Sequence, residues 1–394
     1  MSVNKVRDVS HEQSVVRLVD DLVADAIAHR ASDIHLEPTR ENVRVRFRID
    51  GVLVEKEPFL LRLASAIVAR LKVLAGMNIA ERRTPQDGKF HVVYEDNDVD
   101  IRVATFPSLY GEKVVIRILN RILQTIDLDS LGFEKDMLAV FKRLMHRQNG
   151  FFLVTGPTGS GKTTTLYAAL SFLNSPEKNI VTIEDPVEYS LDGVTQAQIN
   201  AGSGFVFEKG MRALVRQDPD IIMVGEIRDK VTARIAIEAA LTGHLVLSTL
   251  HTNNAPGALM RLMDMGVEPF LLNAALSGVL AQRLVRKLCL ECREKRDATD
   301  HERALLRSLG IDSGYVYHAT GCADCDNVGY KSRIGIFELL EITPELRSLI
   351  INNPQCDVLY HQALSDGMKT LVQDGAQKVK DGIISLEEFV KVIL

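Results

Sequence analysis

The stretch GPTGSGKT at residues 156–163 restricts what this chain can fold into more than any other part of its sequence. It fits the pattern GxxxxGK[ST], follows the apolar run FFLVT and precedes KTTTLYAALSFL, which has a helical composition. Glycines let backbone N–H groups turn inward and cradle phosphate oxygens, and the N-terminus of a following helix adds its positive end. A strand, this loop and a helix in that order predict a phosphate site in an α/β domain.

The side chains of the same loop predict how a nucleotide is held. Lys162 is placed to reach the β- and γ-phosphates, and the Thr163 hydroxyl is placed to bind Mg²⁺. No NKxD stretch follows, which favours ATP over GTP. The predicted nucleotide contacts are Gly156, Pro157, Thr158, Gly159, Ser160, Gly161, Lys162, Thr163 and Thr164.

Four apolar runs around this loop predict the sheet that carries it. They alternate with helical segments, and each is almost continuously apolar rather than alternating, as in a parallel sheet that is buried on both faces. The runs are FFLVTG (151–156), IVTIED (180–185), DIIMVGE (220–226) and HLVLSTL (244–250).

Acidic residues end two of these runs. Glu226 closes DIIMVGE, and Glu184 with Asp185 closes IVTIED. Ligands gather at the carboxyl ends of parallel strands, and hydrolysis needs a carboxylate that positions water near the γ-phosphate. We predict that Glu226 positions the water and that Glu184 assists at the metal or the water. Ordinary loop carboxylates are the alternative.

Two histidines bracket the run LVLSTL. Because a strand separates His244 from His251, they lie about 20 Å apart and cannot share one metal. Two interpretations remain open. They are ordinary polar histidines with satisfied hydrogen bonds, or they serve as a γ-phosphate sensor or a subunit contact.

The N-terminal part has a different pattern. A helix is expected near 13–30 and another near 60–75, with short strands at 33–38, 101–107 and 111–119, so we predict a small α+β domain. Within it, VRVRFRIDG (43–51) alternates arginine with apolar residues, so one face of a strand carries guanidinium groups: Arg44, Arg46 and Arg48. A solvated sheet face and an anion held by that face are both consistent with this pattern.

Composition excludes some classes of function. The chain has 394 residues and a net charge of -5, whereas a general nucleic-acid binder is usually basic. No signal peptide is evident in MSVNKVRDVSHEQS, and no apolar stretch is long enough to span a bilayer. We therefore expect a cytoplasmic protein with no direct nucleic-acid partner, which reaches a membrane only through other proteins.

Four of the five cysteines form two CxxC pairs. CLEC contains Cys289 and Cys292, and CADC contains Cys322 and Cys325. Four thiolates make the closed tetrahedral set of a structural Zn²⁺ site, and paired CxxC in an intracellular chain favours metal over disulfides. Unligated thiols are the alternative.

The motifs taken together resemble a known family. GPTGSGKTTTL, TIEDPVEY, RQDPDIIMVGEIRD and LTGHLVLSTLHTN are similar to the Walker A, Asp, Walker B and His boxes of the secretion-type ATPase superfamily. ASDIHLEP, VRFRIDGVL, AERRTPQDGK and GEKVVIRIL resemble its N-terminal domain. The resemblance runs from about residue 13 to the end and is strongest to the type II secretion ATPase and the type IV pilus assembly ATPase.

The resemblance implies a RecA-like P-loop ATPase domain and supports zinc at the cysteines. It also implies that arginines of the N-terminal domain close on the phosphates of ATP. Arg46 and Arg48 are candidates, Arg102 and Arg117 match the family pattern at least as well, and Arg212 is a candidate within the ATPase domain. The expected divisions are an α+β domain (1–120), a linker (121–135), the ATPase domain (136–286), a four-cysteine zinc module (287–341) and a helical C-terminal segment (342–394).

The function implied is a homohexameric ATPase at the cytoplasmic face of the inner membrane. It would power pseudopilus assembly for type II secretion through an inner-membrane platform. A pilus assembly ATPase is the alternative, and a DNA-transfer motor is a more distant one. Two features depart from the family: Val231 replaces an acid, and an N-terminal docking domain does not precede the matched region. Either the sequence is part of a longer protein, or this member recruits its partner differently.

Overall fold

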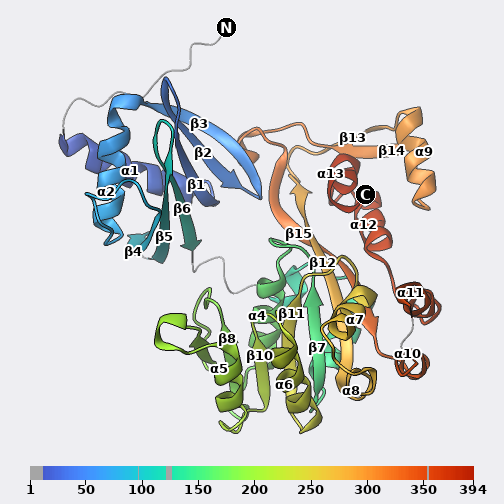
Figure 1. Ribbon diagram of the computed structural model, residues 1–394. Coiled ribbons are helices and arrows are strands. Elements are labelled where there is room, and N and C mark those ends of the chain that lie inside the picture. Colours follow the sequence, from blue (N-terminus) through green and yellow to red (C-terminus); the bar gives the residue numbers. More distant parts are fainter. Residues whose placement is uncertain (1–11, 96, 121–126, 353–354) are drawn as a thin grey trace. The chain divides into compact units, whose positions relative to one another are not determined.

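The computed structural model describes residues 12–95, 97–120, 127–352 and 355–394 (Figure 1). By their internal contacts the residues form two units, Met1–Gln124 and Thr125–Leu394, called here the N-terminal unit and the C-terminal unit. Residues 121–126, the first part of the expected linker, lie outside the described residues. None of the described helices is long and apolar enough to cross a membrane.

The N-terminal unit is a six-stranded antiparallel sheet in the order β3-β2-β1-β6-β5-β4. Two α-helices pack on one face of it, with the short helix η1 (Leu61–Leu63) before the second. The elements are α1 (Glu12–Ala28), β1 (Ala31–Pro38), β2 (Asn42–Ile49), β3 (Val52–Leu60), α2 (Ala64–Leu74), β4 (Gln86–Tyr94), β5 (Asn97–Ser108) and β6 (Gly111–Asn120).

Alternation along β2 explains how this sheet is built. Val43, Val45 and Phe47 are each no more than 2% exposed and pack into the core under the helices. Successive side chains of a strand point to opposite faces, so Arg44, Arg46 and Arg48 lie on the other face of the sheet. The strand that the arginine pattern predicts is therefore present, with its apolar residues inward.

The C-terminal unit is built on a seven-stranded sheet in the order β15-β12-β7-β11-β10-β8-β9. All neighbouring pairs are parallel except β12 with β15. The four apolar runs form strands at Gly150–Thr155, Ile180–Glu184, Ile221–Val224 and Leu245–Leu250, and every residue of these strands is buried, as expected for strands covered on both faces. The strands are β7 (Gly150–Thr155), β8 (Ile180–Glu184), β9 (Thr195–Gln198), β10 (Ile221–Val224), β11 (Leu245–Leu250), β12 (Leu276–Leu288) and β15 (Tyr330–Glu341).

Helices cover both faces of this sheet (Figure 1). One layer contains α3 (Lys135–Met145) and α4 (Lys162–Leu173). The other layer contains α5 (Phe207–Leu214), α6 (Lys230–Leu241), α7 (Ala255–Asp264), α8 (Pro269–Ala275), α10 (Pro344–Ile350) and α11 (Cys356–Ser365). This arrangement is an α/β fold.

A smaller core lies around the far end of β12. It joins that strand to a two-stranded ribbon and to three helices. The elements are β13 (Glu294–Asp297), α9 (Asp300–Ser308), β14 (Tyr315–His318), α12 (Leu371–Lys380) and α13 (Leu386–Ile393). The segment 287–341, expected as a cysteine module, thus contains the last residues of β12 and all of β15, which belong to the large sheet.

Candidate functional site

The glycine loop lies between the end of β7 and the start of α4. Gly156, Gly159 and Gly161 have φ angles of 151°, 80° and 86°, which favour glycine. A Cβ at Gly156 would lie 2.4 Å from the carbonyl oxygen of Gln282, and one at Gly161 would lie 2.8 Å from its Nε2. Strand β12 therefore forms a wall behind the loop, and only glycines let the loop pack against it.

Lys162, the first residue of α4, is folded over this loop. Its Nζ donates to the carbonyl oxygens of Gly156 at 2.9 Å and Pro157 at 3.1 Å. Burial lowers the pKa of Lys162, the charge of Glu226 raises it, and Arg283 lowers it further. The ammonium group is thus held at the loop within electrostatic reach of one predicted acid.

The rest of the loop has a buried base and an exposed tip. Pro157, Thr158 and Gly159 are exposed, and Thr163 and Thr164 are partly buried on the first turn of α4. The Ser160 side chain is buried, and its hydroxyl has no hydrogen-bond partner among the described residues. A buried hydroxyl without a partner at a phosphate loop is consistent with a ligand that supplies one.

Glu226 follows β10 and lies in a cluster of charged side chains. Arg228 forms an ion pair with its Oε1, and His251 Nε2 lies 3.6 Å from its Oε2. Burial and the charge of Lys162 lower the pKa of His251, although Glu226 opposes this shift. Arg228 also lies 3.6 Å from Asp185. The structure therefore brings Lys162, Glu226 and His251 into one electrostatic group.

His244 lies at the other end of β11 and has a local role. Its Nδ1 contacts the carbonyl oxygen of Ala239 at 2.8 Å and the hydroxyl of Thr242 at 3.3 Å. The two histidines bracket the strand as the spacing predicts, and they have different surroundings.

Glu184, at the end of β8, is 3% exposed and bonded within the protein. Tyr167 donates to its Oε2, while Thr182 at 2.6 Å and Gln196 at 3.2 Å donate to its Oε1. Burial raises the pKa of Glu184 and outweighs these hydrogen bonds. Both oxygens of Glu184 thus accept hydrogen bonds, whereas at Glu226 Oε1 is paired with Arg228 and Oε2 has His251 at 3.6 Å.

Two residues of β12 near the loop carry no sequence signal. Gln282 is 2% exposed and accepts a hydrogen bond from Thr165 of α4 at 2.7 Å. Arg283 contacts Asn253 at 3.2 Å, and its charge lowers the pKa of Lys162. Only the pairing of β12 beside β7 brings them to the loop, so motif reading could not find them.

The predicted arginines occupy distinct surroundings. Within the N-terminal unit, Arg46 is paired with Glu37, whereas Arg48 and Arg117 flank Asp33. Arg102 is the direct cross-strand neighbour of Arg117. In the C-terminal unit, Arg212 of α5 is 60% exposed and pairs with Glu208 one turn earlier.

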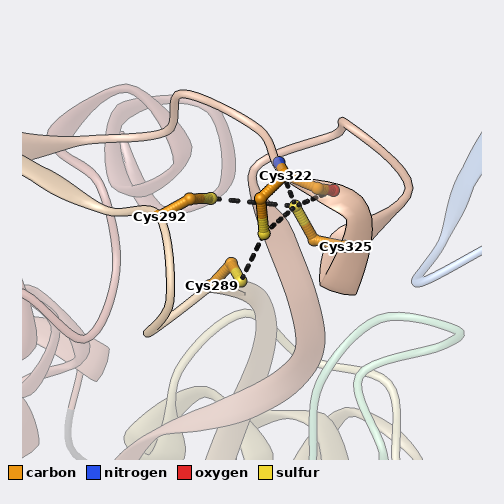
Figure 2. A group of neighbouring side chains, drawn as sticks. All are labelled: Cys289, Cys292, Cys322 and Cys325. Atoms are coloured by element: carbon orange, nitrogen blue, oxygen red, sulfur yellow. Dashed lines mark hydrogen bonds between the residues drawn. The ribbon is translucent and has the colours of Figure 1, made fainter.

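The four predicted cysteine ligands converge between the end of β12 and the start of β15 (Figure 2). Their sulfur atoms all lie within 4.8 Å of one another. Cys289 and Cys322 are 3.9 Å apart, and Cys325 lies 3.7 Å from both Cys292 and Cys322. A tetrahedron with Zn–S bonds of about 2.3 Å has edges of about 3.8 Å, so this set fits zinc.

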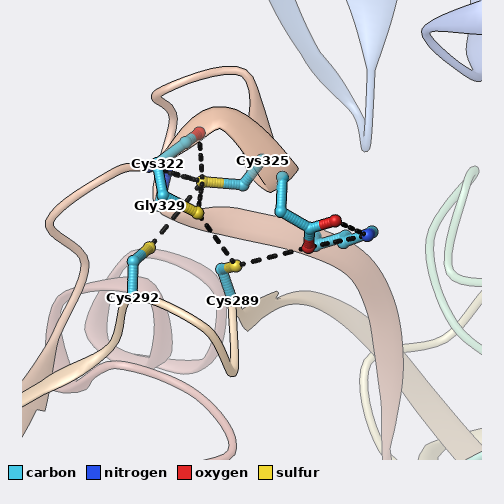
Figure 3. Close-up of polar contacts among 7 residues, drawn as sticks. Cys289, Cys292, Cys322, Cys325 and Gly329 are labelled. Carbon is cyan, nitrogen blue, oxygen red and sulfur yellow. Dashed lines mark hydrogen bonds and ion pairs between the residues drawn. The ribbon is translucent and has the colours of Figure 1, made fainter.

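Backbone groups support the same set. The N–H groups of Cys322 and Gly329 donate to Cys325 Sγ at 3.2 Å and 3.1 Å (Figure 3). Burial raises the pKa of the Cys325 thiol, but these hydrogen bonds, together with contacts to the Cys322 and Cys292 side chains, lower it to about 7. Donors aimed at sulfur stabilise a thiolate, which is the form that binds metal. Cys356 lies apart, at the start of α11.

The loop between β7 and α4, with a carboxylate after β10, defines a P-loop nucleotide-binding protein. The family model described as "Type II/IV secretion system protein" matches residues 8–391. The chain belongs to this family and is one of its ATPases.

Relatives and a solved structure agree with this assignment. The type II secretion system ATPase E of Vibrio cholerae is 47% identical over 378 residues, which cover 96% of this chain and 75% of that protein. The type IV pilus assembly ATPase PilB of Myxococcus xanthus is 46% identical over 395 residues, which cover 99% of this chain and 69% of that protein. The crystal structure of the pilus retraction motor PilT with bound ADP matches with a TM-score of 0.62 at 27% identity. The match covers 94% of this chain and 95% of that one.

Proposed function

We propose that this chain is a hexameric motor that hydrolyses ATP to power pseudopilus assembly in type II secretion. It would act at the cytoplasmic face of the inner membrane through a platform protein. The observation that carries the proposal is the grouping of Lys162, Glu226 and His251 beside a glycine loop. The similarity to a type II secretion ATPase over 96% of the chain supports type II secretion as the process that it powers.

The residues of the loop have separate tasks in this proposal. Backbone N–H groups and Lys162 bind the phosphates, and the Thr163 hydroxyl would hold Mg²⁺, which neutralises phosphate charge when bound. Glu226 orients the attacking water and takes up its proton. In this arrangement Arg228 binds one carboxylate oxygen of Glu226 and His251 lies near the other, so both orient the acid.

We propose an indirect part for Glu184. Its two oxygens are already bonded to Tyr167, Thr182 and Gln196, so direct contact with metal or water needs one of these bonds to open. Tyr167 belongs to α4, the helix that begins at the loop. This difference in surroundings favours Glu226 over Glu184 as the acid that contacts water.

Among the arginines of the N-terminal unit, exposure favours Arg117 as a phosphate contact, and Arg102 is its direct cross-strand neighbour. Arg46 is 23% exposed and bound to Glu37, whereas Arg117 is 62% exposed. Arg48 and Arg212 stay secondary candidates, because Arg48 is less exposed than Arg117 and Arg212 pairs with Glu208 on its own helix. Guanidinium groups stabilise the charge of a transferring phosphoryl group.

We also propose that Cys289, Cys292, Cys322 and Cys325 hold structural Zn²⁺. Metal analysis of the purified chain should find about one zinc per chain, and Cys292→Ser should lose it and lower the melting temperature by about 5 °C. Cys356→Ser is the matched control and should keep the zinc and the melting temperature of the unaltered chain. Equal zinc in the two variants would contradict the assignment.

The test of the proposed function uses Glu226→Gln. This variant should bind ATP but release phosphate at least about 100-fold more slowly than the unaltered chain. Glu238→Gln, an exposed acid on α6, is the control. Unchanged phosphate release by Glu226→Gln would contradict the site.

The Glu226→Gln variant also tests which membrane assembly the motor acts on. With ATP bound, it should capture type II secretion components from native membranes. Capture of pilus platform proteins instead would support pilus assembly, which the 46% identity to PilB keeps as the second candidate. ATPase activity that DNA stimulates would favour a DNA-transfer motor over both.

A further inference from the structure

Strand β12 passes beside the glycine loop, and its register places one charged side chain there. The strand runs parallel to β7, with Ala281 opposite Thr155, the last residue of β7. Arg283 therefore lies just past the end of β7, where the chain turns into the loop, and Gly156 packs directly against the backbone of Gln282. Because successive side chains of a strand point to opposite faces, Arg283 points away from α4, the helix that Gln282 contacts.

The hydrogen bonds of Arg283 go only to neutral oxygen atoms. Its Nη2 donates to the carbonyl oxygen and the side-chain oxygen of Asn253 at 3.2 Å and 3.3 Å. Its Nη1 donates to the carbonyl oxygen of Gln282 at 3.3 Å. Within the part of the chain that the structure describes, no carboxylate forms an ion pair with this partly buried guanidinium group. A positive charge that leaves water is stabilised most by an anionic partner, so this group can accept one.

The acid nearest in effect to Arg283 is already bonded elsewhere. Glu338 of β15 is 2% exposed, and its Oε1 accepts a hydrogen bond at 2.7 Å from the N–H group of Ala255, the first residue of α7. Burial lowers the pKa of Arg283, and the charge of Glu338 only opposes that shift. The carboxylate thus holds the start of α7 and leaves the N–H donors of Arg283 without an ion pair.

A second cation lies within electrostatic reach of Arg283. The charge of Arg283 lowers the pKa of Lys162, and the charge of Glu226 raises it. Glu226 is itself paired with Arg228, so it does not neutralise both cations at the loop. A phosphate group beside Lys162 would remove the repulsion between the two, and a guanidinium group binds phosphate through two N–H groups at once.

We propose that Arg283 binds the terminal phosphate of ATP beside Lys162 and thereby makes the site prefer ATP to ADP. The inference rests on the proposed function and deepens it. In that function Glu226 positions water at the terminal phosphate, and Lys162 is the group that both Glu226 and Arg283 act on. All of these residues belong to the C-terminal unit, so the contact needs no residue of the N-terminal unit.

The test compares the affinities for ATP and ADP, both with Mg²⁺, by titration calorimetry. All chains also carry Glu226→Gln, so that hydrolysis does not interfere. Arg283→Gln should weaken ATP binding about tenfold and ADP binding by less than about twofold. Arg283→Lys keeps the charge but loses the paired donors, so its ATP affinity should lie between these values.

Lys287→Gln is the matched control. It removes one positive charge from the same strand, farther from the end of β7. Its affinities for ATP and ADP should stay within about twofold of the parent. Retained ADP binding by Arg283→Gln shows that this variant is folded, so a loss confined to ATP supports the proposal.

The other outcomes separate this inference from the proposed function. If the Glu226→Gln parent fails to bind ATP, the proposed function and the role of Arg283 both fail. If the parent binds ATP and Arg283→Gln binds it equally well, only the role of Arg283 is overturned. Equal weakening of ATP and ADP binding also overturns that role, because the contact is then not to the terminal phosphate.

Discussion

The two sheets of the molecule carry their charged side chains in different places. In the C-terminal unit the central strands β7, β8, β10 and β11 are buried on both faces, and polar residues gather in loops at the strand ends, after β7, β8 and β10. In the N-terminal unit one face is buried, and the other carries the charges along the whole length of its strands. Parallel and antiparallel sheets are expected to differ in this way.

The difference determines what a single substitution can do. At a strand end, several groups converge on one loop, and among the described residues no second cation repeats the contacts of Lys162 to Gly156 and Pro157. On an open face, cations lie side by side and share carboxylates, as Arg44 and Lys113 share Glu37. We therefore expect large effects from the first region and graded effects from the second.

The largest effect is expected from Lys162→Ala. Loss of the ammonium group removes the charge that binds the phosphates, so phosphate release should fall by at least about 100-fold. Lys230→Ala, an exposed lysine at the start of α6, should leave the rate unchanged. If the Lys162→Ala chain still hydrolyses ATP, the glycine loop is not the catalytic site. The expected difference between substitutions in the two sheets would then also be wrong.

A smaller effect is expected from Arg117→Gln. It should raise the KM for ATP or lower the rate by about tenfold, because one charge-assisted contact to phosphate is lost. Arg44→Gln removes the same charge from the same face but from a residue bound to Glu37, and steady-state kinetics should differ little from the unaltered chain. Equal behaviour of the two variants would show that the whole face is simply solvated.

The smallest effect concerns stability. The pKa of Glu37 is about 2 in the folded chain, below its ordinary value of 4.5, so its ion pairs stabilise the fold above the ordinary value. That stabilisation should be lost as the pH falls from 4.5 through about 2. Glu37→Gln should lower the free energy of unfolding by about 1 kcal/mol at neutral pH.

Thermal unfolding at about pH 7 and about pH 3 tests this prediction. The difference in melting temperature between Glu37→Gln and the unaltered chain should be smaller at the lower pH. Glu41→Gln, in the exposed turn between β1 and β2, is the control and should show no such trend. If the difference in melting temperature grows as the pH falls, the predicted loss of stabilisation by Glu37 at low pH is wrong.

The same contrast explains what the sequence could predict. The glycine loop, Glu226 after its strand and the four cysteines each depend on residues close in the chain or on fixed ligand chemistry, and the structure has them in the expected elements. The partners of the arginines depend on cross-strand register, which alternation leaves undetermined. Glu37 and Asp33 pair with the arginines only because β1 lies between β2 and β6.

Gln282 and Arg283 were missed for a related reason. Their strand reads as a generic apolar run, and its place beside β7 is a property of the topology, not of any local motif. The bonds that hold Glu184 are equally non-local, since Tyr167 and Gln196 come from α4 and β9. A carboxylate at a strand end can thus be active or structural, and sequence alone does not separate the two.

Strand β12 links two chemically unrelated places. Gln282 backs the glycine loop and contacts α4 through Thr165, and seven residues later Cys289 begins the cysteine cluster. Between them the strand is paired with β15 and spans about 23 Å in extended form. An extended, paired strand changes length very little, so β12 keeps the glycine loop and the cysteine cluster at a fixed separation along the chain.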